Sequence, residues 1–293
     1  MHTELTKDIL ENKEKLQPNF KDSGTQKILE NAKENWIEYT PKPTESKIVG
    51  VDGSENPLKF QGYTVWAVKA NAVDQNSKVL FEEHDFGVEI PSKVKEIFDS
   101  IRPKLEYQVA RSASPNADLV LLDGTLTSRF YFKEKKILEK SEDDIIKTIN
   151  ECENIFYIAK NSTSDETFKG KMADIAFYDH ATTSNGFSKL RTDERPYLKE
   201  KVGTWNLKKI YYTYVRIPGT RGCFKLELYG SDYTDENVKP IIDKISYNCV
   251  KGYPFVLKQA HNKCVIKNSY MRRVQRMAGG GIGAFGAREI LNG

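Results

Sequence analysis

The chain has 293 residues, and its 45 lysines and arginines against 41 aspartates and glutamates give a formal net charge of +4. Hydrophobic residues make up 39% of the chain and aromatic residues 11%, too much apolar material for an intrinsically disordered protein. No apolar run approaches the roughly 20 residues of a membrane span, and the charged first residues lack the apolar stretch of a signal peptide. We therefore expect a cytoplasmic protein that makes no membrane contact.

The cysteines lie far apart and form no Cys-x-x-Cys pair, so a structural zinc site has no support. Isolated thiols are typical of a reducing compartment. The four are Cys152, Cys223, Cys249 and Cys264.

Residues 1–46 predict a helical arm followed by a linker. Apolar residues recur there at helical spacing as far as Ile37, and Pro41 and Pro43 then interrupt the pattern. We therefore divide the chain into this arm and one α/β domain over residues 47–293.

Three strands are predicted next. Lys47–Val51 is short and rich in β-branched residues, and Gly62–Val73 and Lys78–Val88 are longer strand-like runs. The last two are separated by Asp74–Ser77, which has the composition of a turn. These strands can form an antiparallel meander.

A helix and a buried strand follow. The helix is indicated by apolar residues repeating every four positions, at Ile97, Ile101, Leu105 and Val109. Pro103 should either kink this helix or begin a second one. The continuous apolar run within Asp118–Leu122 is typical of a central parallel strand that is buried on both faces.

The remaining elements complete an α/β pattern. We expect helices over residues 134–150, Glu236–Cys249 and Pro254–Val265, a strand over Ile155–Lys160, and a hairpin of Tyr211–Ile217 with Phe224–Tyr229. The order β-β-β-α-β-α-β predicts a mixed sheet flanked by helices, the strand order of RNase H-like folds.

Two aspartates occupy corresponding places in this pattern. Asp52 and Asp123 each follow an apolar strand, and each is followed by glycine. If the two strands are neighbours, both carboxylates meet at the carboxyl edge of the sheet, where a cation would offset their repulsion. Oxygen ligands of this kind select Mg²⁺ or Mn²⁺. The alternative is that each Asp-Gly pair is only a turn.

Glu106 offers a third carboxylate. It lies on the helix that leads into the Asp123 strand, so its side chain could lean over the sheet edge. A glutamate on a helix is more often a solvated surface residue.

Several short motifs of the chain resemble those of the NurA nucleases and stand in the same order as in that family. The similarity covers about residues 45–285, and its motifs are Val49–Ser54, Leu105-Glu106, Leu121–Leu126, Tyr157–Ser162, and Tyr253-Pro254-Phe255 with Ala260-His261.

This resemblance implies an archaeal or bacterial, RNase H-like, metal-dependent DNA nuclease. It implies 5′–3′ exonuclease and single-stranded DNA endonuclease activity in the resection of double-strand breaks, with two Mn²⁺ or Mg²⁺ ions in each active site. It also implies a homodimer that works with a HerA-type hexameric translocase.

The site residues follow from the same resemblance. Asp52 would bridge two ions, while Glu106 and Asp123 would each complete one. His261 would be a further ligand or a proton donor to the leaving group. Lys160, at the end of its strand, would stabilise charge on the scissile phosphate.

The strongest local charge run is basic and lies near the C-terminus. Between Lys258 and Arg276 it holds no acid, and its bases are Lys258, Lys263, Lys267, Arg272, Arg273 and Arg276. Such a run can bind DNA phosphates, with Tyr253, Phe255 and Tyr270 available to stack on bases. It could equally dock the translocase.

Two other functions remain open. Actin-like and sugar-kinase-like ATPases also place Asp-Gly loops at strand ends, and Gly279–Gly281 could serve as an adenosine loop, although the chain is short for two such lobes. A non-catalytic adaptor of the translocase is the third possibility. Gly281–Gly286 fits the dinucleotide motif by letter, but only seven residues follow it, so no βαβ unit can form.

Overall fold

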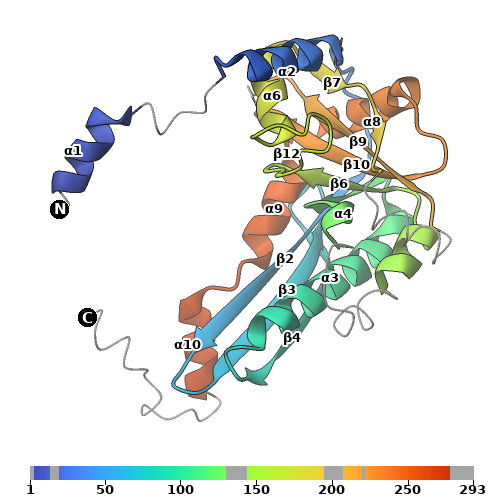
Figure 1. The fold of residues 1–293 in the computed structure, drawn as a ribbon. Helices are drawn as coiled ribbons and strands as arrows, with labels where there is room; N and C mark the ends of the chain where they lie inside the picture. The colour runs from blue at the N-terminus through green and yellow to red at the C-terminus, as the bar shows by residue number, and fades with distance from the viewer. Residues whose placement is uncertain (1–2, 14–19, 130–143, 195–206, 220–221, 278–293) are drawn as a thin grey trace.

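The computed structural model describes residues 3–13, 20–129, 144–194, 207–219 and 222–277 (Figure 1). Within them, ten strands form one mixed sheet, and a separate two-stranded hairpin lies beside it. In this described part of the chain, none of the helices has both the length and the apolar composition to cross a membrane.

The centre of the sheet is the predicted RNase H-like arrangement. β2 (Ile48–Lys59), β3 (Thr64–Val73) and β4 (Val79–Glu89) form the antiparallel meander. β5 (Leu119–Asp123) pairs in parallel with β2 on one side and with β6 (Ile155–Ala159) on the other. The strand order β4-β3-β2-β5-β6 therefore confirms the predicted mixed sheet.

The sheet continues beyond β6 through antiparallel pairs. β10 (Phe224–Gly230) and β9 (Lys209–Arg216) form the predicted late hairpin. The other strands are short: β7 (Gly186–Ser188), β1 (Trp36–Glu38), β8 (Arg191–Thr192), β11 (Cys249–Val250) and β12 (Tyr253–Pro254). β7 and β8 pair with β9, β1 pairs with β7, and β11 with β12 forms the separate hairpin.

Helices cover both faces of this sheet. α3 (Val94–Ala113) and a helix over residues 144–151 pack on one face, and α8 (Asp235–Tyr247) and α9 (Phe255–Cys264) pack on the other. The remaining helices are α1 (Thr3–Glu11), α2 (Ser23–Glu34), the 3₁₀ turn η2 (Ser114–Asn116), α4 (Leu126–Arg129), α6 (Asp174–Ala181) and α10 (Asn268–Met277). The sheet residues between these layers are apolar and buried, which explains the continuous apolar run of β5.

The N-terminal segment differs from its prediction. The helix ends at Glu34 rather than continuing to Ile37, and the next residues form β1 in the main sheet. The reason is the burial of Trp36, whose ring packs near Tyr178, so tertiary packing outweighs the helical spacing. The division of the chain after residue 46 stays a prediction.

β2 is longer than predicted. It was expected to end at Val51, but it runs on to Lys59 because β3 continues to pair with it after its pairing with β5 stops at Val51. Asp52-Gly53 is therefore not a turn. Asp123-Gly124 does end its strand, and Gly124 has φ +99°, which suits glycine.

Two helix boundaries also need correction. α3 continues through Pro103, so the second helix allowed by the sequence does not form. α8 ends at Tyr247, and Cys249 belongs to β11, whose pairing with β12 competes with the helix. The predictions for residues 134–143 and 278–286 lie outside the described residues.

Candidate active site

The two aspartates predicted to meet do lie side by side. Val51 pairs with Leu122 in the parallel β2–β5 ladder, so the next residue on each strand is Asp52 and Asp123. Residues at matched positions of parallel strands point to the same face of the sheet. Asp52 is 7% exposed, and its Oδ1 accepts a hydrogen bond from the Gly53 amide at 2.8 Å.

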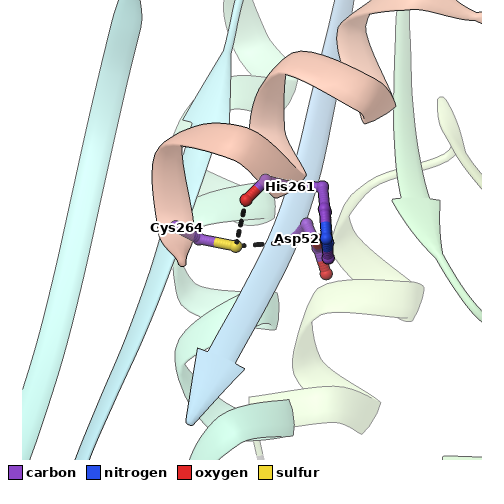
Figure 2. A group of neighbouring side chains, drawn as sticks. All are labelled: Asp52, His261 and Cys264. Atoms are coloured by element: carbon purple, nitrogen blue, oxygen red, sulfur yellow. Dashed lines mark hydrogen bonds and ion pairs between the residues drawn. The ribbon is translucent and has the colours of Figure 1, made fainter. Parts of the chain in front are cut away.

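α9 places His261 and Cys264 directly over Asp52 (Figure 2). His261 Nδ1 lies 2.9 Å from Asp52 Oδ2, and the thiol of Cys264 lies 3.6 Å from the same oxygen. The helix can approach this closely because β2 has a glycine at position 50. A Cβ there would be 2.5 Å from the backbone carbonyl of Val256.

Glu106 is the third carboxylate of the acidic cluster that it forms with Asp52 and Asp123. It approaches from α3, on the face of the sheet opposite to α9. It is 3% exposed, and α3 directs it toward Gly53, where an added Cβ would be 2.5 Å from Glu106 Oε1. Arg129 Nη2 contacts its other carboxylate oxygen, and Arg102 Nε lies 3.8 Å from Oε1. Glu106 therefore lies beside Gly53, the residue that follows Asp52, and lines the same cleft as both aspartates.

The electrostatics of Asp52 reflect this crowding. The pKa of its carboxyl is raised to about 6, chiefly by burial and then by the charges of Asp123 and Glu106, against the lowering effect of His261. A carboxylate that is costly to ionise in the metal-free protein is stabilised when a cation binds beside it.

A cleft of about 950 Å³ opens over the cluster. Lys160, which directly follows β6, lies on its wall with Nζ 5.6 Å from the ring centre of Tyr253. The Tyr253 hydroxyl donates to Asp123 Oδ1 at 3.3 Å, and burial and the charge of Asp123 raise the pKa of this hydroxyl. Lys258 also lines the cleft. A phosphate entering it would meet cations on the wall and carboxylates on the floor.

The donor atoms fit a hard divalent ion. The ligand atoms of Asp52, His261 and Cys264 lie within 4.8 Å of one another. Burial and the charge of Asp52 raise the pKa of the Cys264 thiol, so it remains a neutral S–H group that donates to the carboxylate. Carboxylate oxygens and one imidazole then remain for the ion, and such a set suits Mn²⁺ and Mg²⁺.

The six predicted DNA-binding residues are exposed but do not gather at the cleft. Lys258 and Lys263 lie on α9, Lys267 precedes α10, and Arg272, Arg273 and Arg276 lie on α10. Of these, only Lys258 lines the cleft, while Lys267 and Arg273 line a second groove between α10 and the β3–β4 strands. Figure 1 shows α10 beside the lower ends of these strands in the picture, away from the rest of the sheet.

Sequence reasoning missed several residues of the site. Arg129 and Arg102 hold Glu106, and Tyr253 was considered only for stacking on bases, although its hydroxyl contacts Asp123. No local pattern marks either arginine. His180 stacks on Phe20 with ring centres 3.5 Å apart and is not part of the cleft wall.

The chain matches one protein family over most of its length. The family model of the NurA domain matches residues 46–266. The DNA double-strand break repair nuclease NurA of Sulfolobus acidocaldarius is 25% identical over 272 residues, covering 78% of this chain and 80% of that protein. The protein of the same name from Saccharolobus solfataricus is 26% identical over 280 residues, covering 80% and 82%.

Solved structures share the fold. The crystal structure of the NurA nuclease from Sulfolobus solfataricus superposes with a TM-score of 0.80 at 22% identity, covering 95% of this chain and 97% of the other. A crystal structure of NurA bound to dAMP and manganese has a TM-score of 0.62 at 14% identity, covering 93% and 94%.

Proposed function

The chain belongs to the NurA family, and from this premise we propose that it is a DNA nuclease of double-strand break repair that hydrolyses phosphodiester bonds with divalent ions. The observation that carries the proposal is the convergence of Asp52, Asp123 and Glu106, with His261, at the floor of one cleft. Two of these carboxylates, Asp52 and Glu106, are buried, and negative charges held this close together favour a bound cation.

We assign the metal site to Asp52, Glu106, Asp123 and His261, with Mn²⁺ or Mg²⁺ as the ion and two ions as the expected number. When bound, such ions activate water and neutralise charge on the phosphate and the leaving oxygen. Asp52, which contacts His261 and neighbours Asp123, is the residue suited to bridging. The manganese-containing structure of NurA supports the choice of metal.

The other cleft residues orient the phosphate and the ligands. Lys160 and Lys258 present ammonium groups to a phosphate in the cleft, where they can offset its charge. Tyr253 fixes the orientation of Asp123 through its hydroxyl. His261 contacts Asp52 through Nδ1, which leaves its other ring nitrogen to ligate an ion or to give a proton to the leaving oxygen.

We further propose the substrates and partners that the sequence resemblance implies. DNA ends and single strands are the substrates, with 5′–3′ exonuclease and single-stranded endonuclease activity. A second copy of the chain and a HerA-type hexameric ATPase are the partners. The exposed bases of α10 lie away from the cleft, so they can serve DNA passing toward it or the translocase.

Cleavage of labelled single-stranded DNA is expected with Mn²⁺, to stop with EDTA, and to return when Mn²⁺ is restored. A parallel incubation with ATP and Mg²⁺ distinguishes the ATPase alternative. Turnover of ATP without DNA loss would favour a kinase-like protein. Inactivity toward both, in a preparation that still binds a HerA-type hexamer, would favour an adaptor.

Lys258→Ala is expected to weaken DNA binding, because one phosphate contact is lost. A plot of the logarithm of the binding constant against the logarithm of the salt concentration should become less steep by about one unit. Lys239→Ala on α8 is the matched control, since Lys239 pairs with Glu236 outside the cleft. Fluorescence anisotropy at several salt concentrations measures both slopes. Equal slopes for the two variants would remove Lys258 from the DNA path.

A further inference from the structure

A buried ion pair lies in the sheet next to the site but outside the cleft wall. Lys225 and Glu227 stand two residues apart on β10 and are 1% and 0% exposed, with Lys225 Nζ 2.7 Å from Glu227 Oε1. Lys225 Nζ also lies 4.6 Å from the ring centre of Tyr212. A buried pair of this kind can often be replaced by apolar residues without loss of stability. Its presence therefore calls for a reason other than stability.

The pair holds the beginning of α4. Glu227 accepts one hydrogen bond from the Thr127 amide at 3.1 Å and another from its hydroxyl at 2.9 Å. α4 has four residues and follows the Asp123-Gly124 turn, so it is too short to be stable by its own backbone bonds. Glu227 thus supplies the acceptor that fixes this turn against the sheet.

The end of α4 holds the acidic cluster. Arg129 is 8% exposed, and its Nη2 contacts both the Glu106 carboxylate and the backbone carbonyl of Asp123, the latter at 3.4 Å. Arg102 reaches the other oxygen of Glu106 at 3.8 Å from a half-exposed position. Arg129 is therefore the principal group that sets the orientation of the Glu106 carboxylate.

We propose that Arg129 is a positioning residue for Glu106 as a metal ligand, and that Lys225 and Glu227 keep Arg129 in place through Thr127. The proposal rests on the proposed function, because it takes Glu106 to bind a divalent ion. A carboxylate oxygen has two lone pairs, so Glu106 can accept from Arg129 and still face an ion. Groups that orient ligands in this way change metal affinity by about 10–100-fold when they are replaced.

The test measures Mn²⁺ binding to full-length protein by the electron paramagnetic resonance signal of free Mn²⁺, together with DNA cleavage over a range of Mn²⁺ concentrations. Arg129→Lys keeps the charge but loses the planar fork. The matched control is Arg216→Lys, because Arg216 is likewise a buried arginine, on β9, and pairs with Asp179 outside the cleft. Melting temperatures show whether each variant folds.

Arg129→Lys is expected to bind Mn²⁺ about 10–100-fold more weakly and to require correspondingly more Mn²⁺ for cleavage. Arg216→Lys should bind Mn²⁺ as the wild type does, even if its melting temperature falls. Binding by Arg129→Lys within twofold of the wild type would overturn the proposal. So would a loss of Mn²⁺ affinity in Arg216→Lys equal to that in Arg129→Lys.

Thr127→Val decides the matter if Arg129→Lys does not fold, since it preserves side-chain shape and removes one bond to Glu227. A weaker affinity for Mn²⁺ in Thr127→Val supports the proposal, and an unchanged affinity overturns it. A wild-type protein that neither binds Mn²⁺ nor cleaves DNA would overturn the proposed function itself. If the wild type binds Mn²⁺ and cleaves DNA but the variants do not show the expected loss of Mn²⁺ affinity, only the proposed role of Arg129 is overturned.

Discussion

Asp52→Asn is expected to abolish DNA cleavage and, in the metal-free protein at neutral pH, to raise the melting temperature. Cleavage is lost because the amide cannot replace the charged oxygen proposed to bridge the ions. Stability rises because the wild type must ionise a buried carboxyl whose pKa is raised from 3.8 to about 6 by burial and by Asp123 and Glu106. One pKa unit corresponds to 1.36 kcal/mol, so the gain is at most about 3 kcal/mol.

The gain in stability from Asp52→Asn increases as the pH rises. Well below pH 3.8 the carboxyl is protonated in both the folded and the unfolded chain, so the substitution changes little. As the pH rises from 3.8 to about 6, the unfolded chain ionises first and the wild type loses stability relative to Asp52→Asn; above pH 6 the full difference is present.

Thermal unfolding in EDTA at pH 4 and pH 7.5 measures this difference. The control is Asp85→Asn, which changes an exposed aspartate of β4 away from the cleft. Wild-type cleavage rates in Asp52→Asn would end the metal-site assignment. A melting temperature lowered equally at both pH values would mean that the hydrogen bonds to Asp52 outweigh its burial.

Gly50→Ala should lower both stability and cleavage, although position 50 contacts no substrate. Its Cβ would lie 2.5 Å from the Val256 carbonyl group and 2.8 Å from the Leu257 amide, so α9 must move away from β2. Overpacking of this kind costs about 1–3 kcal/mol. Because α9 also carries His261, we expect cleavage at a given Mn²⁺ concentration to fall at least about tenfold, as for loss of a ligand-orienting group.

Gly222→Ala is the matched control for this experiment, since an added Cβ there would meet only Asp179 Oδ2 at an ordinary 3.8 Å. Thermal unfolding and Mn²⁺-dependent cleavage are compared for the two variants. Full activity with an unchanged melting temperature in Gly50→Ala would show that the α9–β2 contact has room to adjust.

The parts of the site that could be predicted are those with a local signature. Asp52 and Asp123 follow apolar strands, and the structure confirms that those strands are neighbours. His261 required the family motif, because a single histidine on a helix has no distinguishing pattern. Glu106 was suggested by its place on the helix and by the resemblance, whereas its contacts with Gly53 and Arg129 have no signature in the sequence.

The errors have a common physical origin in pairing and packing between distant segments. The end of β2 could not be predicted, because the residues directly after Gly53 are polar, Pro57 follows them, and β3 imposes their strand conformation. β1 formed where a helix was expected because Trp36 is buried against the sheet. The link from Glu227 to Thr127 spans 100 residues and has no sequence pattern at either end.

The contact between Asp52 and His261 joins residues 209 positions apart. During synthesis, the strands that carry both aspartates leave the ribosome long before the helix that supplies the histidine. If His261 is a ligand, as proposed, we expect no competent nuclease to form before α9 packs over β2. Translation order by itself thus delays the appearance of a DNA-degrading activity until α9 has been synthesised.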